Sequence, residues 1–93
     1  MFAGSTYRGR YGGEEFLLVL PRASKEQATA VVDRLREIVA ALDWSAISDG
    51  LLVTISAGMT QFRSDEACDE ILARADAALY CAKDAGRNCV VSA

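Results

Sequence analysis

Two glycines followed by two glutamates, Gly12-Gly13-Glu14-Glu15, form the part of this sequence whose residue types could do chemistry. Glycine has no side chain to hold a ligand away from the backbone, and hard divalent cations prefer carboxylate oxygens. The stretch could therefore bring bare backbone to a phosphate while the carboxylates hold a metal ion. A solvated turn is the simpler interpretation, because turns are usually polar, and these four residues alone favour it.

A pair of cations near the other end of the sequence is the second candidate. Lys83 and Arg87 are four residues apart, which puts them on one face where a helix ends. Two such cations can neutralise charge on a transferring phosphoryl group. They can equally offset the dipole at a helix C-terminus, and the pair by itself favours that interpretation.

A β-hairpin would have to position the glycine pair. Gly-Gly between two β-like runs is typical of a tight hairpin turn, because both central residues need a positive φ. We expect one strand over residues 7–11 and a second over residues 15–20, which Pro21 ends. Adjacent residues on a strand point to opposite faces, so Glu14 and Glu15 would not hold one ion together in ideal strand geometry.

Two amphipathic helices are predicted after the hairpin. The first covers residues 24–42 with apolar residues at the i, i+3, i+4, i+7 spacing, and Ser24 with Gln27 forms a capping box at its start. The second covers residues 64–85, with Gly86 as its C-terminal cap. The charged residues of the first helix are expected on its solvated face; they are Lys25, Asp33, Arg34, Arg36 and Glu37.

Strands are predicted between and after these helices. Residues 51–62 alternate, and one face carries small residues that would let a helix or a ligand come close. Val90 and Val91 predict a short closing strand. The order is β-hairpin–α–β–α–β, so we assign the class α/β (α+β), with the helices packed on one sheet. With 93 residues, 52% of them hydrophobic, a single domain over residues 1–93 is expected.

Composition and charge exclude several kinds of function. The net charge of −3 gives no general attraction to nucleic acid or to an anionic membrane, so we expect contact with neither. The three cysteines lack a zinc-binding spacing and there is no histidine to complete a metal set, so we predict reduced thiols and a cytoplasmic protein. The sequence shows no signal-peptide pattern and no apolar stretch near the roughly 20 residues that span a bilayer.

The run Arg10-Tyr11-Gly12-Gly13-Glu14-Glu15-Phe16 resembles the signature of GGDEF domains, the diguanylate cyclases, in the variant with glutamate at the third position. Residues 75–88, which read ADAALYCAKDAGRN, are similar to the last helix of that family. The resemblance extends from about Tyr7 to the C-terminus. It implies a partial, nucleotidyl-cyclase-like GGDEF domain from which the family's first strand and first helices are absent, together with their metal-binding and guanine-binding residues.

The resemblance also implies an activity. Diguanylate cyclases are nucleotidyltransferases that bind one GTP on each of two domains, and each 3′-hydroxyl attacks the α-phosphate of the other GTP. The product, cyclic di-GMP, is a bacterial second messenger. The implied partners are therefore GTP and a second GGDEF domain in a homodimer, and the implied cofactor is Mg²⁺, with Mn²⁺ as the alternative ion.

Roles follow from the same resemblance, residue by residue. Glu14 corresponds to the catalytic metal ligand, and Glu15 is a supporting catalytic carboxylate. Gly12 and Gly13 let the turn approach the nucleotide. Lys83 and Arg87 correspond to the residues that bind the triphosphate.

Departures from the family pattern keep a second function open. The inhibitory product site of many members, R-x-x-D, is replaced at its ends by Ala3 and Thr6, so no product inhibition through that site is expected. Absence of the upstream strand would expose apolar surface and an unpaired sheet edge, so we expect concentration-dependent association. The alternative is thus a catalytically inactive GGDEF fragment that acts as a dimerisation or regulatory interaction module.

Overall fold

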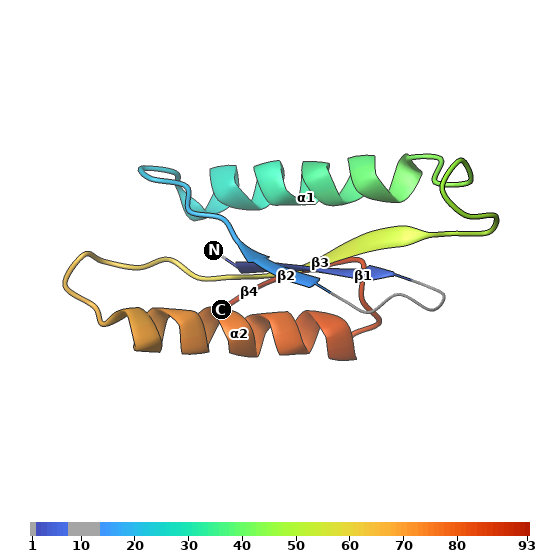
Figure 1. Ribbon diagram of the computed structural model, residues 1–93. Helices are drawn as coiled ribbons and strands as arrows, with labels where there is room; N and C mark the ends of the chain where they lie inside the picture. The colour runs from blue at the N-terminus through green and yellow to red at the C-terminus, as the bar shows by residue number, and fades with distance from the viewer. Residues whose placement is uncertain (1, 8–13) are drawn as a thin grey trace.

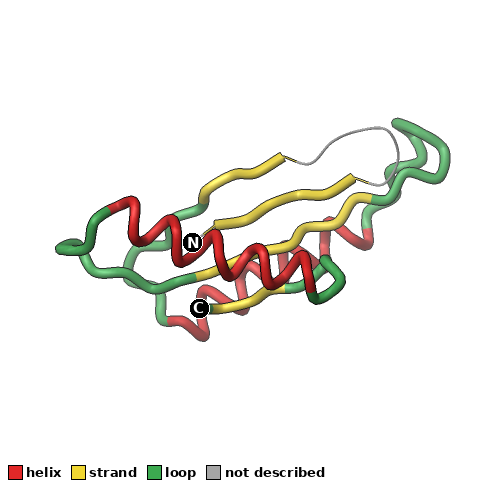
Figure 2. Tube along the Cα trace, turned by 90° about the horizontal axis from the view of Figure 1, so that it is seen from below, coloured by secondary structure: helices red, strands yellow, loops and turns green. Residues whose placement is uncertain are grey.

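A mixed β-sheet lies between two helices, one on each face, in the computed structural model (Figure 1). The structure describes residues 2–7 and 14–93. Within these residues the sheet has four strands in the order β2-β1-β3-β4, seen side by side in Figure 2. The predicted class, α/β (α+β) with helices packed on one sheet, is confirmed.

The first two strands form an antiparallel pair, as the hairpin prediction requires. β1 (Phe2–Tyr7) pairs with β2 (Glu14–Leu17), and Phe2 lies opposite Leu17. β1 begins further N-terminal than predicted, because it also pairs with β3 along its whole length. The rest of the predicted first strand and the Gly12-Gly13 turn lie outside the described residues.

Helix α1 (Lys25–Ala41) forms where its periodicity predicts it. The capping box is present: the Gln27 N–H donates to Ser24 Oγ at 3.1 Å, and the Ser24 N–H donates to Gln27 Oε1 at 2.9 Å. Ala28 and Val32 are buried against the sheet. Three larger apolar residues of this helix remain exposed, Val31, Leu35 and Ile38, and so does Leu42 at its C-cap.

Strand β3 (Val53–Met59) is the centre of the fold, because both of its faces are covered. It is shorter than the predicted residues 51–62. Ser56 and Ala57 are completely buried. A Cβ atom on Gly58 would overlap the backbone of Ala75 and Leu79 in α2, so this glycine permits the close helix approach that the small residues predicted.

Helix α2 (Cys68–Asp84) begins four residues later than the predicted Ser64, which is a correction. Residues 64–66 form a turn instead, and the Glu66 carboxylate accepts a hydrogen bond from Arg74 Nη2 at 2.8 Å. This ion pair spans the turn and the first part of the helix, a use of Glu66 that helical periodicity does not indicate.

The C-terminal end of α2 has the predicted glycine cap. Gly86 has a φ of +113°, and its N–H donates to the Lys83 carbonyl at 3.3 Å. The Arg87 N–H donates to the Ala82 carbonyl at 3.0 Å, which completes a Schellman motif. The closing strand β4 (Val90–Ser92) then pairs in parallel with β3. No helix in the described part of the chain has the length and apolar character needed to cross a membrane.

Candidate functional site

The two segments that carry the predicted site residues lie at the same end of the sheet. Glu14 pairs with Ser5, which in turn pairs with Ile55 of β3. From the other edge, the Asn88 N–H donates to Ser56 Oγ at 3.0 Å. Ile55 and Ser56 are neighbours in β3. The start of β2 is in register with Ile55 and the loop after α2 bonds to Ser56, so the two segments reach adjacent rows of the sheet, that is, adjacent residue positions along its strands.

These segments approach from opposite edges rather than from neighbouring strands. β2 and β4 are three strand spacings apart, which is about 14 Å. Glu14 and Glu15 are the first residues of β2, and Gly12 and Gly13 lie outside the described residues. The site that these residues would form is therefore a surface at the sheet end.

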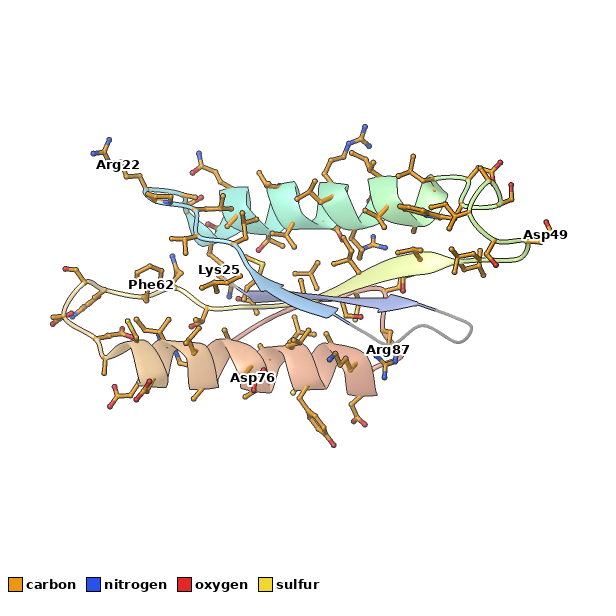
Figure 3. All side chains as sticks on the ribbon, viewed as in Figure 1. Arg22, Lys25, Asp49, Phe62, Asp76 and Arg87 are labelled. Carbon is orange, nitrogen blue, oxygen red and sulfur yellow. The ribbon has the colours of Figure 1, made fainter. Side chains whose placement is uncertain are left out.

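The cationic segment has a well-defined backbone. Lys83 belongs to the last turn of α2 and is half-buried, whereas Arg87 is exposed just beyond the glycine cap (Figure 3). Arg87 and Asn88 have φ values of +65° and +48°, in the left-handed region that asparagine tolerates but arginine rarely adopts. The buried hydroxyl of Ser56 and the side chain of Arg36 both bond to Asn88.

Arg36 does not lie on the solvated face of α1, so the prediction from helical periodicity is wrong for this residue. Its side chain is only 19% exposed, and its Nε donates to Asp33 Oδ1 at 2.7 Å. This hydrogen bond raises the pKa of Arg36 above its ordinary value. Its Nη1 donates to Asn88 Oδ1 at 3.1 Å and to the Asn88 carbonyl at 3.4 Å. The i, i+3 spacing from Asp33 was a signal for the ion pair, but not for the contact with Asn88.

A cavity of about 400 Å³ lies at the other end of the sheet. Its lining includes Arg22, Lys25, Met59 and Phe62, and Figure 3 shows three of these labels far from Arg87. No motif in the sequence indicates this cavity. Because β2 begins at the opposite end, this cavity does not belong to the candidate site.

Comparison with known families tests the resemblance that these two motifs suggest. The family model described as "Diguanylate cyclase, GGDEF domain" matches residues 2–89. The chain belongs to the GGDEF family. The resemblance inferred from the two motifs is thereby confirmed, and the range matched includes Gly12-Gly13-Glu14-Glu15.

Individual GGDEF proteins agree with this assignment. The chain is 44% identical over 79 residues to diguanylate cyclase DgcP of Pseudomonas aeruginosa, a match that covers 85% of this chain and 12% of DgcP. Diguanylate cyclase DgcM of Escherichia coli is 39% identical over 84 residues, which is 90% of this chain and 20% of DgcM. The chain thus spans a fifth or less of the length of these two relatives.

Solved GGDEF structures share the fold. Diguanylate cyclase SiaD of Pseudomonas aeruginosa, solved with its activator SiaC, superposes with a TM-score of 0.77 at 44% identity, over 91% of this chain and 33% of the SiaD chain. The GGDEF domain of DgcB from Caulobacter crescentus, solved with c-di-GMP, gives a TM-score of 0.73 at 32% identity, over 89% of this chain and 49% of that domain's chain.

The predicted metal site has less support than the family assignment. Among the side chains that the structure describes, those of residues 17–93, no group of three or more histidine, cysteine, aspartate or glutamate residues is arranged to hold a metal ion. The donor chemistry at the start of β2 fits a hard divalent cation, because Glu14 supplies a carboxylate there. A metal ion at Glu14 therefore stays a prediction.

Proposed function

We propose that this chain acts as a diguanylate cyclase domain, in which two GTP molecules are joined into cyclic di-GMP with release of pyrophosphate. The supporting observation is that the signature strand β2 and the loop after α2 reach adjacent rows at one end of the sheet. An extended nucleoside triphosphate is comparable in length to the separation of about 14 Å between β2 and β4. Carboxylates on one segment and cations on the other are the combination that phosphoryl transfer uses.

In this proposal the signature segment supplies the acidic groups. Glu14 holds Mg²⁺, with Mn²⁺ as the alternative, and a Glu14 carboxylate oxygen accepts the proton of the ribose 3′-hydroxyl. Glu15 supports it as a second carboxylate. Gly12 and Gly13 let the backbone approach the nucleotide, because they have no side chain. When bound, the metal ion would neutralise phosphate charge and make the hydroxyl more acidic.

The C-terminal segment supplies the phosphate ligands. Lys83 Nζ and the Arg87 guanidinium bind oxygens of the triphosphate and disperse its charge. Each domain holds one GTP, so the reaction requires a second GGDEF domain opposite the first. We assign the reaction to the cytoplasm, where GTP is available and where the free thiols are compatible with reducing conditions; they belong to Cys68, Cys81 and Cys89.

Incubation of the purified chain with GTP and Mg²⁺, followed by chromatographic detection of cyclic di-GMP, tests the proposal. It is run over a range of protein concentrations, because two domains must meet. Glu14→Gln should lower turnover by roughly 10²-fold or more, the usual loss for a positioned base. Arg87→Ala should weaken GTP binding by about tenfold, the loss expected for a charge-assisted hydrogen bond.

Matched controls exist on the same chain. Glu26→Gln alters an exposed carboxylate in the first turn of α1, and Arg22→Ala removes an exposed cation at the opposite end of the sheet. Both variants should keep wild-type turnover and GTP affinity. A wild-type chain that neither binds GTP nor makes cyclic di-GMP, yet associates with itself, would replace the enzyme by the interaction module.

A further inference from the structure

The loop that carries Arg87 has an unusual backbone. Gly86, Arg87 and Asn88 have successive φ values of +113°, +65° and +48°. Glycine adopts such values without strain and asparagine tolerates them, but the arginine between the two carries a side chain that disfavours the left-handed region. Such conformations persist only where the surroundings over-determine them. The contacts around this loop therefore determine the direction in which the Arg87 side chain leaves the backbone.

Three sets of hydrogen bonds hold the loop. Its beginning is tied to α2 by the Schellman motif, in which the Arg87 N–H donates to the Ala82 carbonyl at 3.0 Å. Its end is tied to the sheet, because the Asn88 N–H donates to the completely buried Ser56 hydroxyl at 3.0 Å. The third set comes from Arg36 in α1, although α1 covers the opposite face of the sheet from α2 (Figure 1).

Arg36 is itself held in one orientation. Asp33 accepts from Nε at 2.7 Å, and Glu37 Oε1 lies 3.7 Å from Nη2. Nη1 donates to the side-chain oxygen of Asn88 at 3.1 Å and to its carbonyl at 3.4 Å. A guanidinium offers these donors in a fixed planar arrangement, whereas lysine has one flexible ammonium group. The charge alone could not maintain both the Asp33 contact and the Asn88 contact.

We propose that Arg36 is a positioning residue that clamps Asn88 from the far side of the sheet, keeps the loop at residues 86–88 left-handed, and so directs Arg87 toward the triphosphate. The last step depends on the proposed function. The clamp itself depends only on the contacts of Arg36 with Asp33 and Asn88. Loss of the clamp would let Arg87 and Asn88 relax to negative φ values, which would turn the guanidinium of Arg87 away from its starting direction.

Arg36→Lys and Arg36→Ala test the proposal against the control Arg34→Ala. Arg34 lies on the same helix, its side chain is 73% exposed, and it contacts Glu37 at 3.8 Å. Both Arg36 variants should weaken GTP binding about tenfold, even when lysine conserves the charge. Arg34→Ala should leave GTP affinity unchanged. Urea unfolding of each variant provides the separate measure of stability.

A double-mutant cycle with Arg87→Ala separates positioning from general structural support. If Arg36 acts through Arg87, replacing Arg36 should cause no further loss of GTP affinity once Arg87 is alanine. Equal losses in both backgrounds would show that Arg36 affects binding independently of Arg87, and would overturn the positioning role. Unchanged GTP affinity in Arg36→Lys would overturn it as well.

Hydrogen exchange of the Asn88 amide tests the clamp without GTP. In Arg36→Lys this amide should exchange about tenfold faster, because its bond to Ser56 opens more often. Unchanged exchange would overturn the clamp, whatever the protein does with GTP. If the wild type does not bind GTP but exchange accelerates as expected, the proposed function and the direction of Arg87 toward a triphosphate both fail, while the clamp stands.

Discussion

Gly58→Ala is the substitution whose consequence follows most directly from the geometry of the fold. The added methyl carbon would lie 2.6 Å from Leu79 Cα, and closer still to the Leu79 amide nitrogen and the Ala75 carbonyl oxygen. Ordinary contacts of a Cβ atom begin at 3.4 Å. All three neighbours are backbone atoms, so no change of rotamer can relieve the overlap. Helix α2 as a whole would have to move away from β3.

Ordinary contact distances would require a displacement of somewhat more than 1 Å. A gap of even roughly 0.5–1 Å removes about a quarter to a half of the dispersion energy between the atoms across it. The affected side chains include Leu79, which is 1% exposed, and Ala82, which is completely buried. We expect the free energy of unfolding to fall by about 3 kcal/mol, at the upper end of typical overpacking effects. For a domain of this size that corresponds to a decrease in Tm of roughly 12–24 °C.

Urea unfolding followed by the fluorescence of Trp44 and by circular dichroism measures this loss. Gly50→Ala is the matched control. Gly50 has a φ of +74° and nothing within 4 Å of its virtual Cβ, so the control makes the same chemical change with backbone strain of only about 1 kcal/mol. If Gly58→Ala proves no less stable than Gly50→Ala, the close packing of α2 on β3 is refuted.

Two further predictions concern the ends of the helices. Ser24→Ala should lower the free energy of unfolding by about 1 kcal/mol, because the capping box with Gln27 is lost; thermal unfolding against the exposed control Ser64→Ala checks this, and equal Tm values would contradict it. The hydrogen bond from Arg74 lowers the pKa of Glu66 below its ordinary value. The stability that this ion pair contributes is therefore complete above the unfolded pKa of about 4.3, and it is lost as the pH falls through the lowered pKa of the folded state. Glu66→Gln should therefore lose less stability between pH 7 and pH 3 than the wild type in urea unfolding, and an equal loss in both would count against the ion pair.

Features that depend on neighbouring residues were predictable from the sequence. The capping box joins residues three positions apart, and the Gly86 cap uses carbonyls within the last turn of α2. Apolar periodicity likewise placed α1 to within a residue at each end. The family could be recognised from two contiguous motifs, because a motif keeps its residue types whatever surrounds it. These local features depend on residues close in the sequence, so they can be predicted without knowing which distant residues pack against them.

Element boundaries were less predictable where distant residues compete for the same groups. The first strand was expected beside the glycine pair, but β1 extends to Phe2 because β3 pairs with it. Helix α2 was expected from Ser64, but Glu66 bonds to Arg74 across a turn. Neither partner is identifiable from periodicity, since periodicity reports which side of an element is buried and not what covers it.

By itself, then, the sequence determined the presence of both helices, the capping box of α1, the glycine cap of α2, the α/β class and the family. Tertiary structure alone decided that the start of β2 and the loop after α2 reach adjacent rows of one sheet end, and that Arg36 contacts Asn88 from 52 residues away. Local order arises from interactions along the chain, whereas the direction of Arg87 depends on strand order and on a side chain from the other face of the sheet. These contacts exist only after the layers have packed.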